Sequence, residues 1–139
     1  MKYLLLSLVM VATISCASSA KKLNNISDLR WKYRVILLLS SEDDTRNQQL
    51  FTKYNEAVID RHIVWFIVKD RQVISNYSGG ISEQFVDSTK DNFPLDKYPV
   101  LLIGKDGGIK TQADTFELQL LFSNIDLMPM RQQEMSRNK

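Results

Sequence analysis

The chain has 139 residues, of which 44% are hydrophobic and 24% are charged, a composition typical of one globular domain rather than two. Its 18 basic and 16 acidic residues give a formal net charge of +2, and the two signs are interspersed. This balance argues against nucleic acid as the main partner, because nucleic-acid binding usually needs a clustered basic face.

The first twenty residues have the pattern of a signal peptide. Lys2 supplies a positive end, and an apolar run follows from Tyr3 to Ile14. This run is shorter than the roughly 20 apolar residues that a membrane-spanning helix needs. We therefore predict a protein exported to the periplasm or the extracellular space, with residues 1–20 as its signal peptide.

Two processing routes fit the small residues that follow the apolar run. Cleavage after Ala20 would use the small residues 18–20 as an A-x-A-like site and would discard Cys16 with the signal peptide. Alternatively, residues 13–16 (TISC) resemble the lipobox of bacterial lipoproteins, in which the cysteine becomes a lipid anchor, although Thr13 replaces the usual larger aliphatic residue. Cys16 is the only cysteine, so either route leaves no free thiol and excludes thiol redox activity.

The middle of the chain predicts a strand, a helix and a second strand. The apolar run 34–39 (RVILLL) is typical of a strand buried on both faces. Apolar residues at helical spacing from Leu50 to Val58 predict one helix. The run 63–68 (IVWFIV) predicts the second strand, which completes a β-α-β unit with a parallel pair of strands.

The later part of the chain predicts a helix, a hairpin and a last helix. The second helix should begin near Ser82. The run 100–103 predicts a third strand, and Asp106-Gly107 predicts a tight turn that leads into a fourth strand. Apolar residues at helical spacing over 118–128 predict the last helix, which we expect Pro129 to end.

The order β-α-β-α-β-β-α, with its last two strands as a hairpin, is that of the thioredoxin fold. We predict an α/β, thioredoxin-like domain with a four-stranded mixed sheet and helices on both faces. This domain should span residues 33–131, between a leader segment at 21–32 and a polar C-terminal tail at 132–139. Thioredoxins place a cis proline at the position of Tyr98-Pro99, and the sequence leaves either isomer open here.

Two late motifs, LLIGKDGGIK (101–110) and IDLMPMRQQEM (125–135), resemble a family of secreted domains of unknown function. The resemblance also includes RVILLL and the Asp60-Arg61 corner. Members of this family occur as small exported bacterial proteins. They also occur in vertebrate sushi-repeat-containing and coiled-coil-containing extracellular matrix proteins, where they are linked to adhesion. The resemblance implies a location outside the cytoplasm, and it carries no established enzymatic activity.

The loop 40–45 (SSEDDT) follows the first strand, where redox-active thioredoxin-fold proteins carry Cys-x-x-Cys. Glu42, Asp43 and Asp44 would offer oxygen ligands to a hard cation such as calcium. Alternatively, Asp44 or Thr45 caps the following helix and the other acids favour its positive end. We favour capping, because calcium needs roughly six to eight ligands and no EF-hand spacing is present.

A second candidate site is basic. Lys105, Lys110, Arg131 and Arg137 would bind an acidic glycan or an anionic surface if the end of the chain folded near the hairpin, with Asp106 in the same turn. The alternative is a solvated rim in which Arg131 ties down the last helical turn.

The sequence therefore predicts a non-catalytic module without a cofactor that binds protein or glycan partners in the cell envelope or outside the cell. It would meet a membrane only through a lipid anchor at Cys16. His62 is the only histidine. We expect it to be a capping or surface residue rather than a catalytic base, because no GxSxG-type elbow accompanies it. The rival hypothesis is a carboxylate- or metal-dependent enzyme that uses the loop 40–45.

Overall fold

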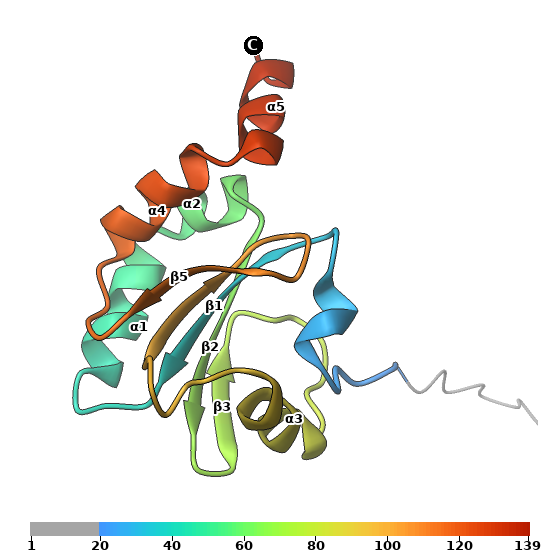
Figure 1. The fold of residues 1–139 in the computed structure, drawn as a ribbon, viewed down its shortest axis with the longest axis vertical. Helices are drawn as coiled ribbons and strands as arrows, with labels where there is room; N and C mark the ends of the chain where they lie inside the picture. Colours follow the sequence, from blue (N-terminus) through green and yellow to red (C-terminus); the bar gives the residue numbers. More distant parts are fainter. Residues whose placement is uncertain (1–19) are drawn as a thin grey trace, which may run out of the picture.

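The computed structural model describes residues 20–139. Cys16 and all of the predicted signal peptide except Ala20 therefore lie outside the described residues. These residues form a five-stranded mixed sheet in the order β3-β2-β1-β4-β5 (Figure 1). The strands are β1 (Arg34–Leu39), β2 (Ile63–Lys69), β3 (Gln72–Ser75), β4 (Val100–Ile103) and β5 (Ile109–Ala113). The helices are the 3-10 helix η1 (Ile26–Leu29) and the α-helices α1 (Asp44–Lys53), α2 (Asn55–Asp60), α3 (Gln84–Asn92), α4 (Leu118–Asp126) and α5 (Pro129–Arg137).

The central strand is β1, as its unbroken apolar run predicts. It pairs in parallel with β2 and antiparallel with β4. Residues 34–38 are all buried, because the strand has neighbours on both edges and helices over both faces. The helices α1 and α2 connect the parallel pair, which confirms the predicted β-α-β unit.

Helices lie over both faces of the sheet (Figure 1), and an apolar layer of buried side chains lies on each face. The side chains of β1 alternate between the layers. Val35 and Leu37 pack in the layer that contains η1 and α3. Ile36 and Leu38 pack in the layer that contains α1, α2 and α4. Helices thus cover both faces of the sheet, as predicted.

The sheet has five strands rather than the predicted four. The additional strand, β3, pairs antiparallel with β2 at the edge of the sheet, after a two-residue turn at Asp70-Arg71. Asp70 has a φ of 37°, a left-handed conformation that Asp tolerates better than most residues. The sequence of β3, QVIS, is short, and its residues alternate between exposed and half-buried. It therefore lacks the continuous apolar run by which the central strands were predicted.

The predicted helix over 50–58 is two helices. The chain leaves the helical conformation at Tyr54, which has φ −105° and ψ 27° and separates α1 from α2. The Tyr54 ring meets Phe122 of α4 edge-on, with 6.5 Å between the ring centroids. Phe51 in α1 and Val58 in α2 are both buried in the same layer. The apolar stripe was therefore predicted correctly, although the helix is broken.

The predicted leader segment, residues 21–32, is part of the folded core. Leu23, Ile26 and Leu29 are each only 3% exposed. Leu23 also forms a parallel bridge with Ile81, which precedes α3. Helix α3 begins at Gln84, two residues after the predicted start. The segment counts as polar in sequence, but its three apolar residues complete the layer over α3.

The prediction that Pro129 ends the last helix is wrong. Helix α4 already ends at Asp126, and Pro129 is the first residue of a further helix, α5, which continues to Arg137. Proline is well suited to this position, because the first turn of a helix needs no intrahelical N–H donor and the fixed φ matches the helix. Most of the predicted polar tail, residues 132–139, is therefore helical.

The hairpin between β4 and β5 forms as predicted. The amide of Gly104 donates to the carbonyl of Gly108 at 2.9 Å, and Gly107 has a φ of 85° that favours glycine. The described residues contain no cis peptide bond, so Tyr98-Pro99 is trans. Among these residues, no helix has the length and apolar character to cross a membrane.

Candidate functional site

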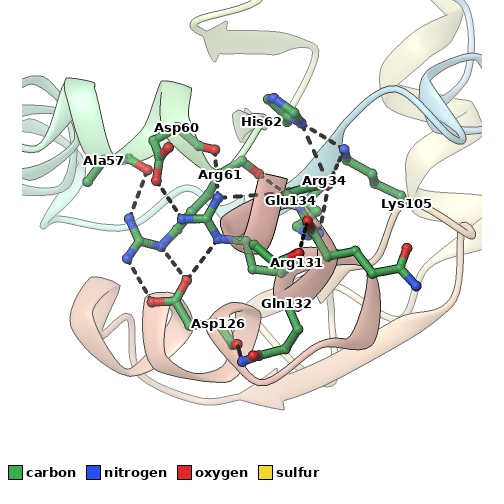
Figure 2. Close-up of polar contacts among 12 residues, drawn as sticks. Arg34, Ala57, Asp60, Arg61, His62, Lys105, Asp126, Arg131, Gln132 and Glu134 are labelled. Atoms are coloured by element: carbon green, nitrogen blue, oxygen red, sulfur yellow. Dashed lines mark hydrogen bonds and ion pairs between the residues drawn. The ribbon is translucent and has the colours of Figure 1, made fainter. Parts of the chain in front are cut away.

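Two polar regions lie at opposite ends of the central strand β1. At its amino end, eight charged or titratable side chains form a network that we call the ionic cluster (Figure 2). Its members are Arg34, Asp60, Arg61, His62, Lys105, Asp126, Arg131 and Glu134. At its carboxyl end, the loop between β1 and α1 lines a second region, a pocket that we call the strand-end pocket.

Glu134 of α5 is the centre of one half of the ionic cluster. Its Oε2 lies 3.0 Å from Nη1 of Arg34, and its Oε1 lies 2.6 Å from Nζ of Lys105. The Arg34 side chain, at the start of the central strand, is only 1% exposed. Arg34 also donates to the carbonyl of Arg61 at 2.9 Å. A buried guanidinium therefore has both a carboxylate and a carbonyl as acceptors, as burial of a charge requires.

Arg131 and Asp126 form the other half. Arg131 donates to the Asp60 carboxylate at 2.5 Å, to the Asp60 carbonyl at 2.9 Å and to the Asp126 carboxylate at 3.1 Å. Arg61 donates to both Asp126 oxygens, at 3.0 and 2.8 Å, and its guanidinium lies 4.5 Å from the centroid of the Phe122 ring. These contacts join the corner between α2 and β2 to the junction of α4 and α5.

The cluster lowers the pKa of its two best-enclosed carboxyl groups. Burial by itself would raise the pKa of Glu134, but hydrogen bonds from Arg34 and Lys105 lower it below its ordinary value. Burial likewise opposes ionisation of Asp126, and hydrogen bonds from Arg61 and Arg131 lower its pKa. Both groups are therefore carboxylates at neutral pH.

His62 is part of the same network. Its Nδ1 lies 2.7 Å from Nζ of Lys105 and 3.8 Å from Oε1 of Glu134. A lysine ammonium can only donate, so Nδ1 is the acceptor of this hydrogen bond. The side chain is 49% exposed. His62 is thus a partly exposed residue that supports Lys105.

The predicted basic site divides between two places. Lys105 and Arg131 belong to the ionic cluster (Figure 2), whereas Lys110 pairs with Asp106 across the hairpin at 2.8 Å. That hydrogen bond, together with one from the Gly108 amide, lowers the pKa of Asp106. Lys105, Asp106 and Lys110 line a pocket of about 310 Å³, which Arg131 does not line. The basic side chains Lys105, Lys110 and Arg131 each pair with a carboxylate of the chain itself. This pairing fits the alternative that Arg131 ties down the end of the chain.

The strand-end pocket has a volume of about 340 Å³. Its lining combines polar and apolar side chains from the loop after β1, from α1, from the residue before β4 and from the loop after β5. Those that matter here are Ser41, Asp43, Arg46, Asn47, Leu50, Pro99, Asp114, Thr115 and Phe116. The pocket lies where the predicted fold would place the thiols of a redox-active relative.

The acidic residues of the loop do not converge on a cation. Asp44 accepts hydrogen bonds from the Ser40 hydroxyl at 2.5 Å and from the Ser41 amide at 2.9 Å. It is the first residue of α1 rather than its cap, and Asp43, at the cap position, makes no side-chain capping bond. Asp44 therefore fastens the loop to the helix. Within residues 20–139, no three His, Cys, Asp or Glu side chains are grouped so that they could hold a metal ion, and Glu42 therefore belongs to no such group.

Glu134 and Asn47 are central to these regions, and the sequence predicted no role for either. Glu134 was assigned to a polar tail, and only its three-residue spacing from Arg131 would have suggested that both side chains share one face of a helix. Asn47 lies between the polar residues of α1 and has no distinguishing motif. It is only 9% exposed and lines the strand-end pocket.

Comparison with known families matches residues 25–134 to a domain of unknown function, DUF4174. No curated protein and no solved structure matches the chain. The matched range begins just before η1 and ends at Glu134, so it includes every element of the sheet and all members of the ionic cluster.

Replacing Glu134 tests the ionic cluster. Glu134→Gln leaves the buried cations Arg34 and Lys105 without their carboxylate, so we expect the free energy of unfolding to fall by about 3 kcal/mol at neutral pH. Urea unfolding measures this change. Glu56→Gln, an exposed substitution in α2, should change it by no more than about 0.5 kcal/mol. Equal effects of the two substitutions would contradict a structural role of the cluster.

The lowered pKa values also predict an acid-sensitive fold. Glu134 has a lower pKa in the folded chain than its ordinary value of 4.5, so the unfolded chain binds more protons below that pH. The stabilisation is complete above the ordinary pKa and is lost as the pH falls through the folded one. Urea unfolding from about pH 6 to about pH 3 should show this decline. Glu134→Gln should have a shallower decline, and an unchanged slope would exclude Glu134 as a source.

Proposed function

The chain belongs to the DUF4174 family, a domain of unknown function, and we propose that it is a non-catalytic binding module with a thioredoxin-like fold that acts outside the cytoplasm. Its partner contact would be the strand-end pocket. The observation that carries this proposal is the contrast between the two polar regions: the basic side chains of the ionic cluster face carboxylates of the chain itself, whereas the amide of Asn47, in a residue only 9% exposed, makes no hydrogen bond within residues 20–139 and is open to the pocket.

The strand order supports a thioredoxin-like fold. Without the edge strand β3, the order is β2-β1-β4-β5, with β1 and β2 parallel and β4 and β5 forming an antiparallel hairpin. This is the arrangement that the element order β-α-β-α-β-β-α leads one to expect. In this view, β3 is an addition to the edge of the sheet, and α5 is an addition to its C-terminal end.

The composition of the loop supports binding rather than redox catalysis. The sequence from Ala20 to Lys139 contains no cysteine, and the loop after β1 offers hydroxyl groups and carboxylates instead. Two of these hydroxyl and carboxylate groups, on Ser40 and Asp44, are engaged with each other at 2.5 Å. The loop is therefore fixed in place and leaves a shaped pocket beside it.

The signal-peptide pattern of residues 1–20 and the resemblance to secreted domains support export. We expect a bacterium that expresses the whole chain to release a product that begins at Lys21, because small residues precede that position. Intact mass and N-terminal sequencing of the fractionated cells identify the product. A palmitate-analogue label that Cys16→Ala removes would instead establish the lipid-anchored route, and an unprocessed cytoplasmic chain would contradict export.

Partner capture tests the binding role of the pocket. The exported wild-type protein should retain a partner from envelope or extracellular fractions, and Thr115→Trp should lose it because the larger side chain fills the pocket. Gln119→Trp, at an exposed position of α4, is the matched control and should retain the partner. Quantitative mass spectrometry of the retained proteins and glycans measures the difference. Equal retention by the wild type and both variants would contradict the pocket as the binding site. Turnover of a substrate without any retained partner would contradict a non-catalytic role.

A further inference from the structure

We propose that the strand-end pocket binds a neutral carbohydrate ring. The inference rests on the proposed function, in which this pocket contacts the partner, and it specifies the chemistry of that partner. It follows from the polar groups that the pocket leaves without protein partners, from its apolar wall and from its balance of charge.

Asn47 provides the first argument. Its side chain is among the buried polar groups of the chain, with the residue only 9% exposed, and it lines the pocket. Among residues 20–139, its carboxamide makes no hydrogen bond and is not one of the fully buried unpaired groups, so its two N–H donors and its carbonyl acceptor are open to the pocket. Asparagine also has a poor helix propensity in the interior of α1. Its presence there is better explained by a ligand than by stability.

The hydroxyl groups near Asn47 provide the second argument. The Ser41 oxygen accepts a hydrogen bond from the Asp43 amide at 3.2 Å, which leaves its own O–H free to donate. Thr115 brings another hydroxyl from the loop after β5. The pocket therefore presents donors and acceptors from three separate segments. Such a set suits a ligand with several adjacent hydroxyl groups.

An apolar wall completes the site. Phe116 and Leu50 are partly buried and pack against the layer that contains α1 and α4. The Phe116 ring is held in place by Phe51, with 5.1 Å between the ring centroids. Pro99 adds an aliphatic ring from the opposite segment. The C–H face of a sugar ring can pack on such a wall while its hydroxyl groups reach the polar side.

The charges disfavour other ligand classes. Asp43 and Asp114 line the pocket together with only one cation, Arg46, so a phosphate or sulfate group would meet more negative than positive charge. A purely apolar side chain would bury the Asn47 amide without a hydrogen bond, which is costly. The volume of about 340 Å³ lies at the low end of the roughly 300–1,000 Å³ of ligand pockets and suits a small oligosaccharide.

Titration with defined oligosaccharides tests the inference. The exported protein, labelled with ¹⁵N, is titrated with maltotriose, cellotriose, galactobiose and chitotriose, while two-dimensional NMR follows its amide signals. At least one sugar should shift the Asn47 side-chain signals together with the backbone signals of Ser41 and Phe116. Asn47→Ala should weaken that binding roughly tenfold, as expected for the loss of two hydrogen bonds. Asn55→Ala, at an exposed position of α2, should leave the binding unchanged.

A thermal melt of each variant separates binding from folding. Asn47→Ala should melt at the wild-type temperature or above it, because alanine favours the helix and no protein hydrogen bond is lost. The inference is overturned if none of the four sugars shifts the pocket signals, or if Asn47→Ala binds as tightly as the wild type. A partner that Thr115→Trp loses, together with no sugar binding, would leave the proposed function intact and replace the carbohydrate by a protein ligand.

Discussion

Burial of Arg34 at the start of the central strand is the constraint on which the rest of the structure depends. Its side chain is 1% exposed, so the fold must supply a carboxylate where water cannot reach. That carboxylate is Glu134, one hundred residues later in the chain. Helix α5 must therefore pack against the amino end of β1, and it brings Arg131 to Asp60 as it does so. Removal of one partner of such a buried pair costs more stability than the pair itself contributes, because the other charge is left buried and unpaired.

The two ends of β1 consequently differ in what they can do. At the amino end, the charged groups from four separate segments satisfy one another, which leaves Lys105 and His62 as members of a structural network. At the carboxyl end, Ser40 and Asp44 fix the loop, while Asn47 faces a pocket without a protein partner. Rigidity at one end and an open polar site at the other suit a binding module, because binding to a preformed site costs less conformational entropy.

The motifs that resemble a family of domains of unknown function meet in this arrangement. The Asp60-Arg61 corner, the lysine of the KDGG turn and the residues of the last motif are distant in sequence but meet in one network (Figure 2). Lys105 was one candidate for binding an external anion, and it donates instead to Glu134 at 2.6 Å. The residue type indicated an acidic acceptor correctly. Only the packing of α5 revealed that this acceptor belongs to the chain itself.

The sequence by itself determined the elements that are marked by strong apolar patterns: the central strands β1, β2 and β4, the hairpin after β4 and the helices on both faces of the sheet. These signals are local, because burial on two faces requires an unbroken apolar run and a tight turn requires glycine. The tertiary structure alone decided the edge strand β3, the helix α5, the inclusion of residues 21–32 in the core and the roles of Glu134 and Asn47. Each of these depends on contacts between distant segments, and a half-exposed strand, a polar helix or a single asparagine carries no local signal of its partner.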